Sequence, residues 1–215
     1  MRALSAASPD ASTVSDRGVY PRGMAEDLSS QIPRVAKDGA TWRLGEPADV
    51  AWISDHTEAG LAITSAIPPV FDAYATIVIP DDQERLPSER ALLKLLTDES
   101  DDQPWWLGYL DTGASDVVFP DAPRVSLYAG WPYVLVRAGA RQAAKWRTDS
   151  PFRGTLPDLM FPSDHAWSTS RLWDDDWYCI GGPRHLVHRA SAEPALRAHS
   201  VGTDENATPP GHTAR

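Results

Sequence analysis

"WWLGYLDTGASDVVFPDAPRVSLYAGWPYVLVRAG", residues 105–139, decides the fold class of this chain. The stretch divides into four short runs, WWLGYLD, DVVF, RVSLY and WPYVLVRAG, which are rich in β-branched and aromatic residues and have turn formers at their joints. Runs of this kind between Gly, Pro and Asp residues are typical of strands joined by tight turns. The stretch therefore predicts an antiparallel sheet.

The rest of the chain adds strands and a few short helices. Further strands are expected at residues 60–67, 74–80, 170–173 and 177–180. Helices are expected at 88–98, 140–147 and 183–190. The first helix places four leucines along one broad face, with Ser88 as its N-cap. Together these elements predict an α+β fold: a single domain with a mostly antiparallel sheet and a few short helices.

The ends of the chain differ in composition from its middle. Residues 1–37 lack the apolar core of a secretory signal and any periodicity, so we expect a disordered or weakly structured segment. Met24 is a second candidate for the translation start, beside Met1. Residues 200–215 are rich in Pro, Gly and polar residues and predict a disordered tail. One globular domain is therefore expected at 38–199.

Charge and cysteine content restrict the partners and the compartment. Thirty acidic residues against 20 basic ones give a net charge of -10, which repels nucleic-acid phosphate and anionic lipid. No apolar run is long enough to span a bilayer, and Cys179 has no second cysteine to pair with. We expect a cytoplasmic, acidic, tryptophan-rich protein that binds neither nucleic acid nor membrane. Its residue usage is typical of GC-rich bacterial genomes.

The stretch LDTGASDVVF, residues 110–119, resembles the catalytic loop of retropepsin-type aspartic peptidases. YCIGGPRHLV, residues 178–187, resembles the second signal of that family, an apolar pair and a Gly before a helix. The resemblance implies Asp111 as the catalytic residue, with Thr112 and Gly113 holding its loop. Because two carboxylates must share one proton and the chain has one such loop, the enzyme would be a symmetric homodimer.

The same letters have a simpler structural interpretation. A strand WWLGYLD, a turn TGAS and a strand DVVF would form a β-hairpin, in which Gly113 supplies the backbone angles of the turn. The Gly-rich flap of retropepsins is also missing between the two signals.

The stretch LWDDDWYCIGG, residues 172–182, carries three consecutive carboxylates. Carboxylates in a loop can hold Ca²⁺ or Mg²⁺, which makes a metal-dependent enzyme a further alternative, but such sites alternate ligands with spacers. The spacing of Cys179, His165, His185 and His188 matches no closed zinc site. The simpler interpretation is a solvated acidic turn, and we expect neither a metal nor a cofactor.

Tryptophan supplies the remaining candidates for a binding surface, because Trp side chains dominate interface energetics. Trp105 and Trp106 are adjacent in an expected strand, so their side chains should point to opposite faces of the sheet. The candidate ligand-binding residues are Trp105, Trp106, Trp173, Asp175 and Trp177.

Two blocks, PWWLGYLDTG and WDDDWYCIGG, resemble an uncharacterised group of bacterial proteins. This resemblance covers most of residues 105–189 and implies one cohesive domain without naming an activity. The leading hypothesis is a protein that acts by binding a protein partner or a small ligand, as an acidic surface with Trp would suit a basic partner. A homodimeric aspartic peptidase is the alternative.

Overall fold

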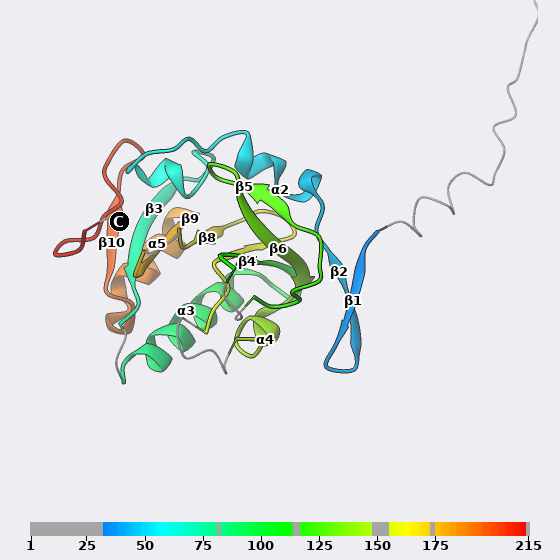
Figure 1. Cartoon of the computed structure of the whole chain (residues 1–215). Coiled ribbons are helices and arrows are strands. Elements are labelled where there is room, and N and C mark those ends of the chain that lie inside the picture. The colour runs from blue at the N-terminus through cyan, green and yellow to red at the C-terminus, as the bar shows by residue number, and fades with distance from the viewer. Residues whose placement is uncertain (1–31, 81–82, 114–116, 148–154, 173–174, 214–215) are drawn as a thin grey trace, which may run out of the picture. The chain divides into compact units, whose positions relative to one another are not determined.

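Ten strands pair into one sheet in the computed structural model, which describes residues 32–80, 83–113, 117–147, 155–172 and 175–213. All pairings between these strands are antiparallel. The strands are β1 (Arg34–Lys37), β2 (Ala40–Leu44), β3 (Ala73–Val78), β4 (Trp105–Leu110), β5 (Val125–Leu127), β6 (Trp131–Ala138), β7 (Leu159–Pro162), β8 (Ser168–Ser170), β9 (Trp177–Gly182) and β10 (Ala198–Val201). Their order is β1-β2-β6-β4-β7-β8-β9-β3-β10, with β5 beside β6 (Figure 1). The predicted α+β fold is confirmed.

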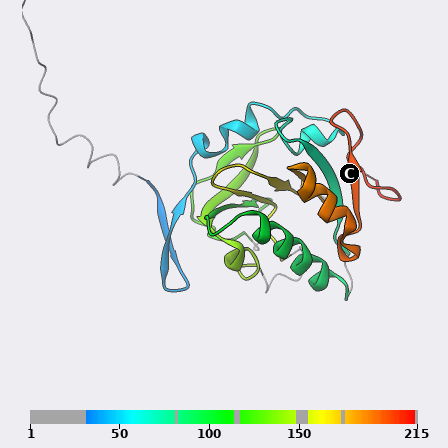
Figure 2. The ribbon, with the colours of Figure 1, turned by 180° about the vertical axis from the view of Figure 1, so that it is seen from behind.

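Helices lie on both sides of this sheet. The described helices are α2 (Pro47–Ser54), α3 (Arg85–Glu99), α4 (Ala140–Ala143) and α5 (Arg184–Ala192), with 3-10 turns η1 (Ile63–Ser65) and η2 (Pro194–Leu196). Figure 2 shows α3 and α5 side by side over one face of the sheet. The main predicted helix is confirmed, but it begins at Arg85, so Ser88 is not its N-cap. Ser88 Oγ instead donates to the Ala195 carbonyl oxygen at 2.6 Å.

The alternation of side chains along the strands builds a core on each face of the sheet. Leu92 and Leu96 of α3 pack with Trp105 on one face of the sheet. Ile53 of α2 packs with Trp106 on the other face. The predicted opposite orientation of the two tryptophans is therefore confirmed. Because helices cover both faces, Trp105 and Trp106 are both buried, and neither offers an open surface to a ligand.

The hairpin expected around Gly113 is wrong. β4 pairs with β6, so the segment between them is a long connection that includes β5, and residues 117–119 are not a strand. Phe119 has a φ of 62°, which is outside the extended region. The strand expected at 60–67 is also wrong, because Ile63–Ser65 form the 3-10 turn η1, and this turn buries Ile63 together with Ile67, four positions later.

The described structure extends beyond the expected range 38–199 at both ends. β1 lies before that range, and Val35 pairs with Trp42 of β2. Residues expected in a disordered tail also pack on the body: Val201 pairs with Tyr74, and the Ala207 N–H donates to the Leu61 carbonyl oxygen at 2.7 Å. The polar composition of these residues gives no sign of this structure, because β10 is held by its pairing with the edge of β3. Residues 1–31 lie outside the described part of the chain.

Close packing explains the glycine pair that ends β9. A Cβ atom on Gly181 would lie 2.5 Å from Phe71 Cδ2 and 2.6 Å from Ile67 Cγ2, so the segment after η1 presses directly on the strand. The IGG stretch is therefore required by packing. In the described part of the chain, no helix has the length and apolar character needed to cross a membrane.

Candidate functional site

Two adjoining cavities open on the face of the sheet that α2 and η1 cover. Their volumes are about 160 Å³ and about 130 Å³. They share four lining residues, Gly60, Ser65, Trp131 and Leu172, so they form one continuous concave surface. We call this surface the twin cavity.

Tyr128 lines the larger cavity in a strained backbone conformation. Its φ of 44° lies in the left-handed region, which is rare for a bulky residue and is concentrated at functional sites. The hydroxyl donates to the Ala66 carbonyl oxygen at 3.1 Å and shares a 2.8 Å hydrogen bond with Ser170 Oγ. Burial raises the pKa of Tyr128, so its hydroxyl stays protonated as a donor. These bonds fix the ring against the cavity.

The wall of the twin cavity comes from segments far apart in the sequence. The larger cavity takes Thr57, Glu58 and Ala59 from the segment after α2, and Ala129 from the turn between β5 and β6. The smaller one takes Leu61, Ala62, Ala66, Asp175, Trp177, Cys179, Ala207 and Thr208. Burial raises the pKa of the Cys179 thiol, so this sulfur is neutral and poorly suited to act as a nucleophile.

The described lining of the twin cavity combines aromatic rings with negative charge. Trp131, Trp177 and Tyr128 supply the rings. Glu58 and Asp175 supply carboxylates, and none of the described lining residues is Lys or Arg. Aromatic faces and carboxylates both attract cations, so the surface suits a positively charged group that carries apolar carbon.

The predicted ligand-binding residues therefore divide into two sets. Asp175 and Trp177 line the twin cavity, whereas Trp105 and Trp106 belong to the two cores. Trp173 lies outside the described residues. Sequence reasoning missed Tyr128, Trp131 and Glu58. A signal was present in the SLYAGWP stretch, where two aromatic residues flank a Gly-containing turn, but their convergence with the segment after α2 depends on the tertiary fold.

Asp111, the proposed peptidase residue, forms an ion pair. Its Oδ2 accepts hydrogen bonds from Arg124 Nε at 2.9 Å and Nη2 at 2.6 Å, and its Oδ1 accepts from the Gly113 N–H at 2.9 Å. The Gly113 N–H and the Arg124 guanidinium hold the pKa of Asp111 below its ordinary value. A carboxylate bound in this way is held ionised, whereas a catalytic pair must share a proton. Thr112 follows as a half-buried residue of the same turn.

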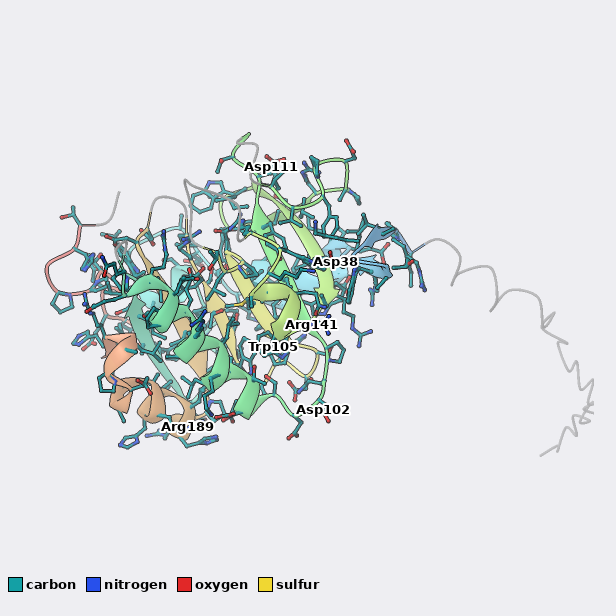
Figure 3. All side chains as sticks on the ribbon, turned by 90° about the horizontal axis from the view of Figure 1, so that it is seen from below. Asp38, Asp102, Trp105, Asp111, Arg141 and Arg189 are labelled. Atoms are coloured by element: carbon teal, nitrogen blue, oxygen red, sulfur yellow. The ribbon has the colours of Figure 1, made fainter. Side chains whose placement is uncertain are left out.

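The two stretches that resemble retropepsins do not meet. Cys179 pairs with Ser170, Ser170 with Leu159, and Leu159 with Gly108, so β9 is separated from β4 by two strands. Because β9 runs opposite to β4, Gly181 lies still further from Asp111 than Cys179 does. Figure 3 shows Asp111 and Trp105 at opposite ends of β4.

Metal ligands do not converge among the described residues: no group of three His, Cys, Asp or Glu side chains there could hold an ion. His185 Nε2 instead lies 2.7 Å from Glu99 Oε1, and His212 Nδ1 lies 2.9 Å from Asp176 Oδ1. Asp174 lies outside the described part of the chain.

Comparison with known proteins found no match to the chain among protein-family models, curated proteins or solved structures.

Proposed function

We propose that the protein acts by binding, and that its twin cavity takes a positively charged group with an apolar stem, such as the Lys or Arg side chain of a protein partner or a small alkyl amine. The observation that carries this proposal is the strained Tyr128, which is held by two hydrogen bonds against a concave surface of aromatic rings and carboxylates. Strain at a cavity wall is a feature of ligand sites.

The charge of the whole chain supports the same conclusion. A net charge of -10 attracts basic partners and speeds their encounter. Glu58 and Asp175 extend this attraction to the twin cavity itself. We expect this binding to occur in the cytoplasm, where a single buried cysteine is stable without a disulfide partner. The ion pair between Asp111 and Arg124 does not favour the peptidase alternative.

The test is a titration of the full chain, followed by tryptophan fluorescence and amide NMR, with n-butylguanidinium, n-butylamine and butyrate. We expect saturable changes with the two cations and none with butyrate. Trp131→Ala and Glu58→Gln should each weaken binding by about tenfold, the result of losing roughly 1.4 kcal/mol. The control Glu193→Gln removes an exposed carboxylate outside the twin cavity and should leave the affinity unchanged.

Two results would contradict the proposal. One is an equal response to butyrate and to the cations, which would show that charge plays no part. The other is an equal loss of affinity in Glu193→Gln and Glu58→Gln, which would place the cation on the general acidic surface.

A further inference from the structure

Three arginines lie in one row across the first strands of the sheet. Arg34 of β1 pairs directly with Arg43 of β2, and Arg43 pairs directly with Arg137 of β6. Residues that pair in this way point their side chains to the same face of the sheet. The same row continues through Trp106 of β4, which pairs with Arg137. We call Arg34, Arg43 and Arg137 the arginine row.

This arrangement is unfavourable without an anion. Like charges placed directly opposite each other in a sheet are destabilising. The chain has only 20 basic residues against 30 acidic ones, yet three of the basic ones are adjacent here. Although the chain has an excess of carboxylates, those among residues 32–80, 83–113, 117–147, 155–172 and 175–213 do not neutralise every member of the row.

Asp49 is the one carboxylate within ion-pair distance of the arginine row among the described residues. It binds Arg43 Nη2 at 2.8 and 2.9 Å. Arg137 donates from Nη2 to Ser163 Oγ at 3.3 Å, a neutral group. The neighbouring Asp164 accepts from Gln103 Nε2 at 2.8 Å. Within the described part of the chain, three guanidinium groups face one carboxylate, so two positive charges have no acidic partner there.

The central member of the row is fixed in place. The Arg43 guanidinium carbon lies 4.9 Å from the centre of the buried Trp106 ring, and Asp49 holds its Nη2. Arg34 is exposed and Arg137 is half-buried, so both flanking members reach solvent. The row therefore places Arg34 and Arg137 on either side of Arg43, whose guanidinium group is held by Trp106 and Asp49.

We infer that the arginine row binds a phosphoryl group. Guanidinium groups recognise phosphate through paired hydrogen bonds, and a phosphate monoester carries about two negative charges at neutral pH, which matches the two uncompensated charges of the row. The site shares no lining residue with the twin cavity, so it is independent of the proposed function.

The experiment measures binding of pyrophosphate and of O-phosphoserine to the full chain by calorimetry, with acetate as a monovalent anion, all at equal ionic strength. We expect saturable binding of at least one phosphoryl probe and none of acetate. Pyrophosphate stands for a free phosphate and O-phosphoserine for an ester-borne one, so their relative affinities distinguish the two sources.

Substitutions inside and outside the arginine row test whether the phosphoryl group binds there. Arg34→Gln and Arg137→Gln should each reduce the affinity by about tenfold, as expected for the loss of one charge-assisted contact. Arg34→Gln changes an exposed side chain and relieves repulsion, so its thermal midpoint without anion should equal or exceed that of the wild type. The matched control is Arg141→Gln, an exposed arginine on α4 that should leave the affinity unchanged (Figure 3).

Three outcomes would overturn the inference. They are the absence of saturable binding by both phosphoryl probes, equal binding of acetate, and an Arg141→Gln variant that loses as much affinity as Arg34→Gln. A normal response of the twin cavity to butylguanidinium in the same samples would show that the protein is folded, so failure at the row would leave the proposed function intact.

Discussion

Asp158 Oδ2 lies 2.7 Å from Arg147 Nη2, and both side chains are almost completely buried. The same carboxylate accepts the backbone N–H of Leu110 at 2.9 Å, and its Oδ1 accepts from Arg171 Nη2 at 2.7 Å. One carboxylate thus joins β4, the segment after α4 and the end of β8. This network fixes the end of the sheet from which the Asp111 turn departs.

Asp158→Asn should destabilise the fold severely. The substitution leaves the buried Arg147 and the largely buried Arg171 without their shared anion, and removing one partner of a buried ion pair costs about 3 to 5 kcal/mol of unfolding free energy. Urea unfolding followed by tryptophan fluorescence measures this loss. Asp98→Asn, which breaks exposed pairs with Lys94 and Arg189, is the control and should change stability little. Equal effects of the two substitutions would contradict this prediction.

Acid should remove the contribution of the Asp158 carboxylate to the free energy of unfolding. Burial opposes its ionisation, but Arg147 and Arg171 outweigh burial and lower the pKa of Asp158 to about 2. A folded-state pKa below the unfolded value of 3.8 means that the stabilisation is complete above pH 3.8 and is lost as pH falls towards 2. The gap in unfolding free energy between wild type and Asp158→Asn should shrink by about 2 kcal/mol between pH 4 and pH 2. A constant gap over this range would contradict the assignment.

Gly181→Ala should be poorly tolerated. The added methyl group would lie 2.5 Å from Phe71 Cδ2 and 2.6 Å from Ile67 Cγ2, and overpacking of this kind costs about 1 to 3 kcal/mol. The control is Gly139→Ala, since a Cβ there meets Gln142 Oε1 at an ordinary 3.6 Å. Thermal unfolding of both variants tests the close approach, and equal midpoints would argue against it.

Asp111→Asn should lower the stability of the fold and should not change the digestion of peptides. The neutral amide weakens the two contacts with Arg124 and costs about 1 to 2 kcal/mol, as expected for hydrogen bonds to a charged group. Incubation of wild type and variant with a peptide library at mildly acid pH should give identical digests. Cleavage by the wild type that the variant lacks would restore the peptidase hypothesis.

Local patterns predicted the elements that carry their own signal. The leucine spacing of α3, the β-branched and aromatic residues of β6 and the adjacent tryptophans of β4 each indicate structure within one segment, and all three elements are confirmed. The Gly113 hairpin failed because β4 takes its partner from β6, beyond β5. The twin cavity could not be predicted, because its wall joins residues from 57 to 208 that share no local pattern.

The partners of β3 lie far along the chain, so they are synthesised long after β3 itself. Tyr74 meets Gly181 and Val201, and Ser88 of α3 reaches Ala195, 107 positions later. During synthesis, β3 therefore leaves the ribosome long before either of its neighbours exists, and its two edges stay unpaired meanwhile. Ala207 and Thr208 close the twin cavity, so a nascent chain that has not yet reached them has no complete site to occupy. If the twin cavity binds a ligand as we propose, that binding requires that translation has passed residue 208 and that β9 and β10 have paired with β3.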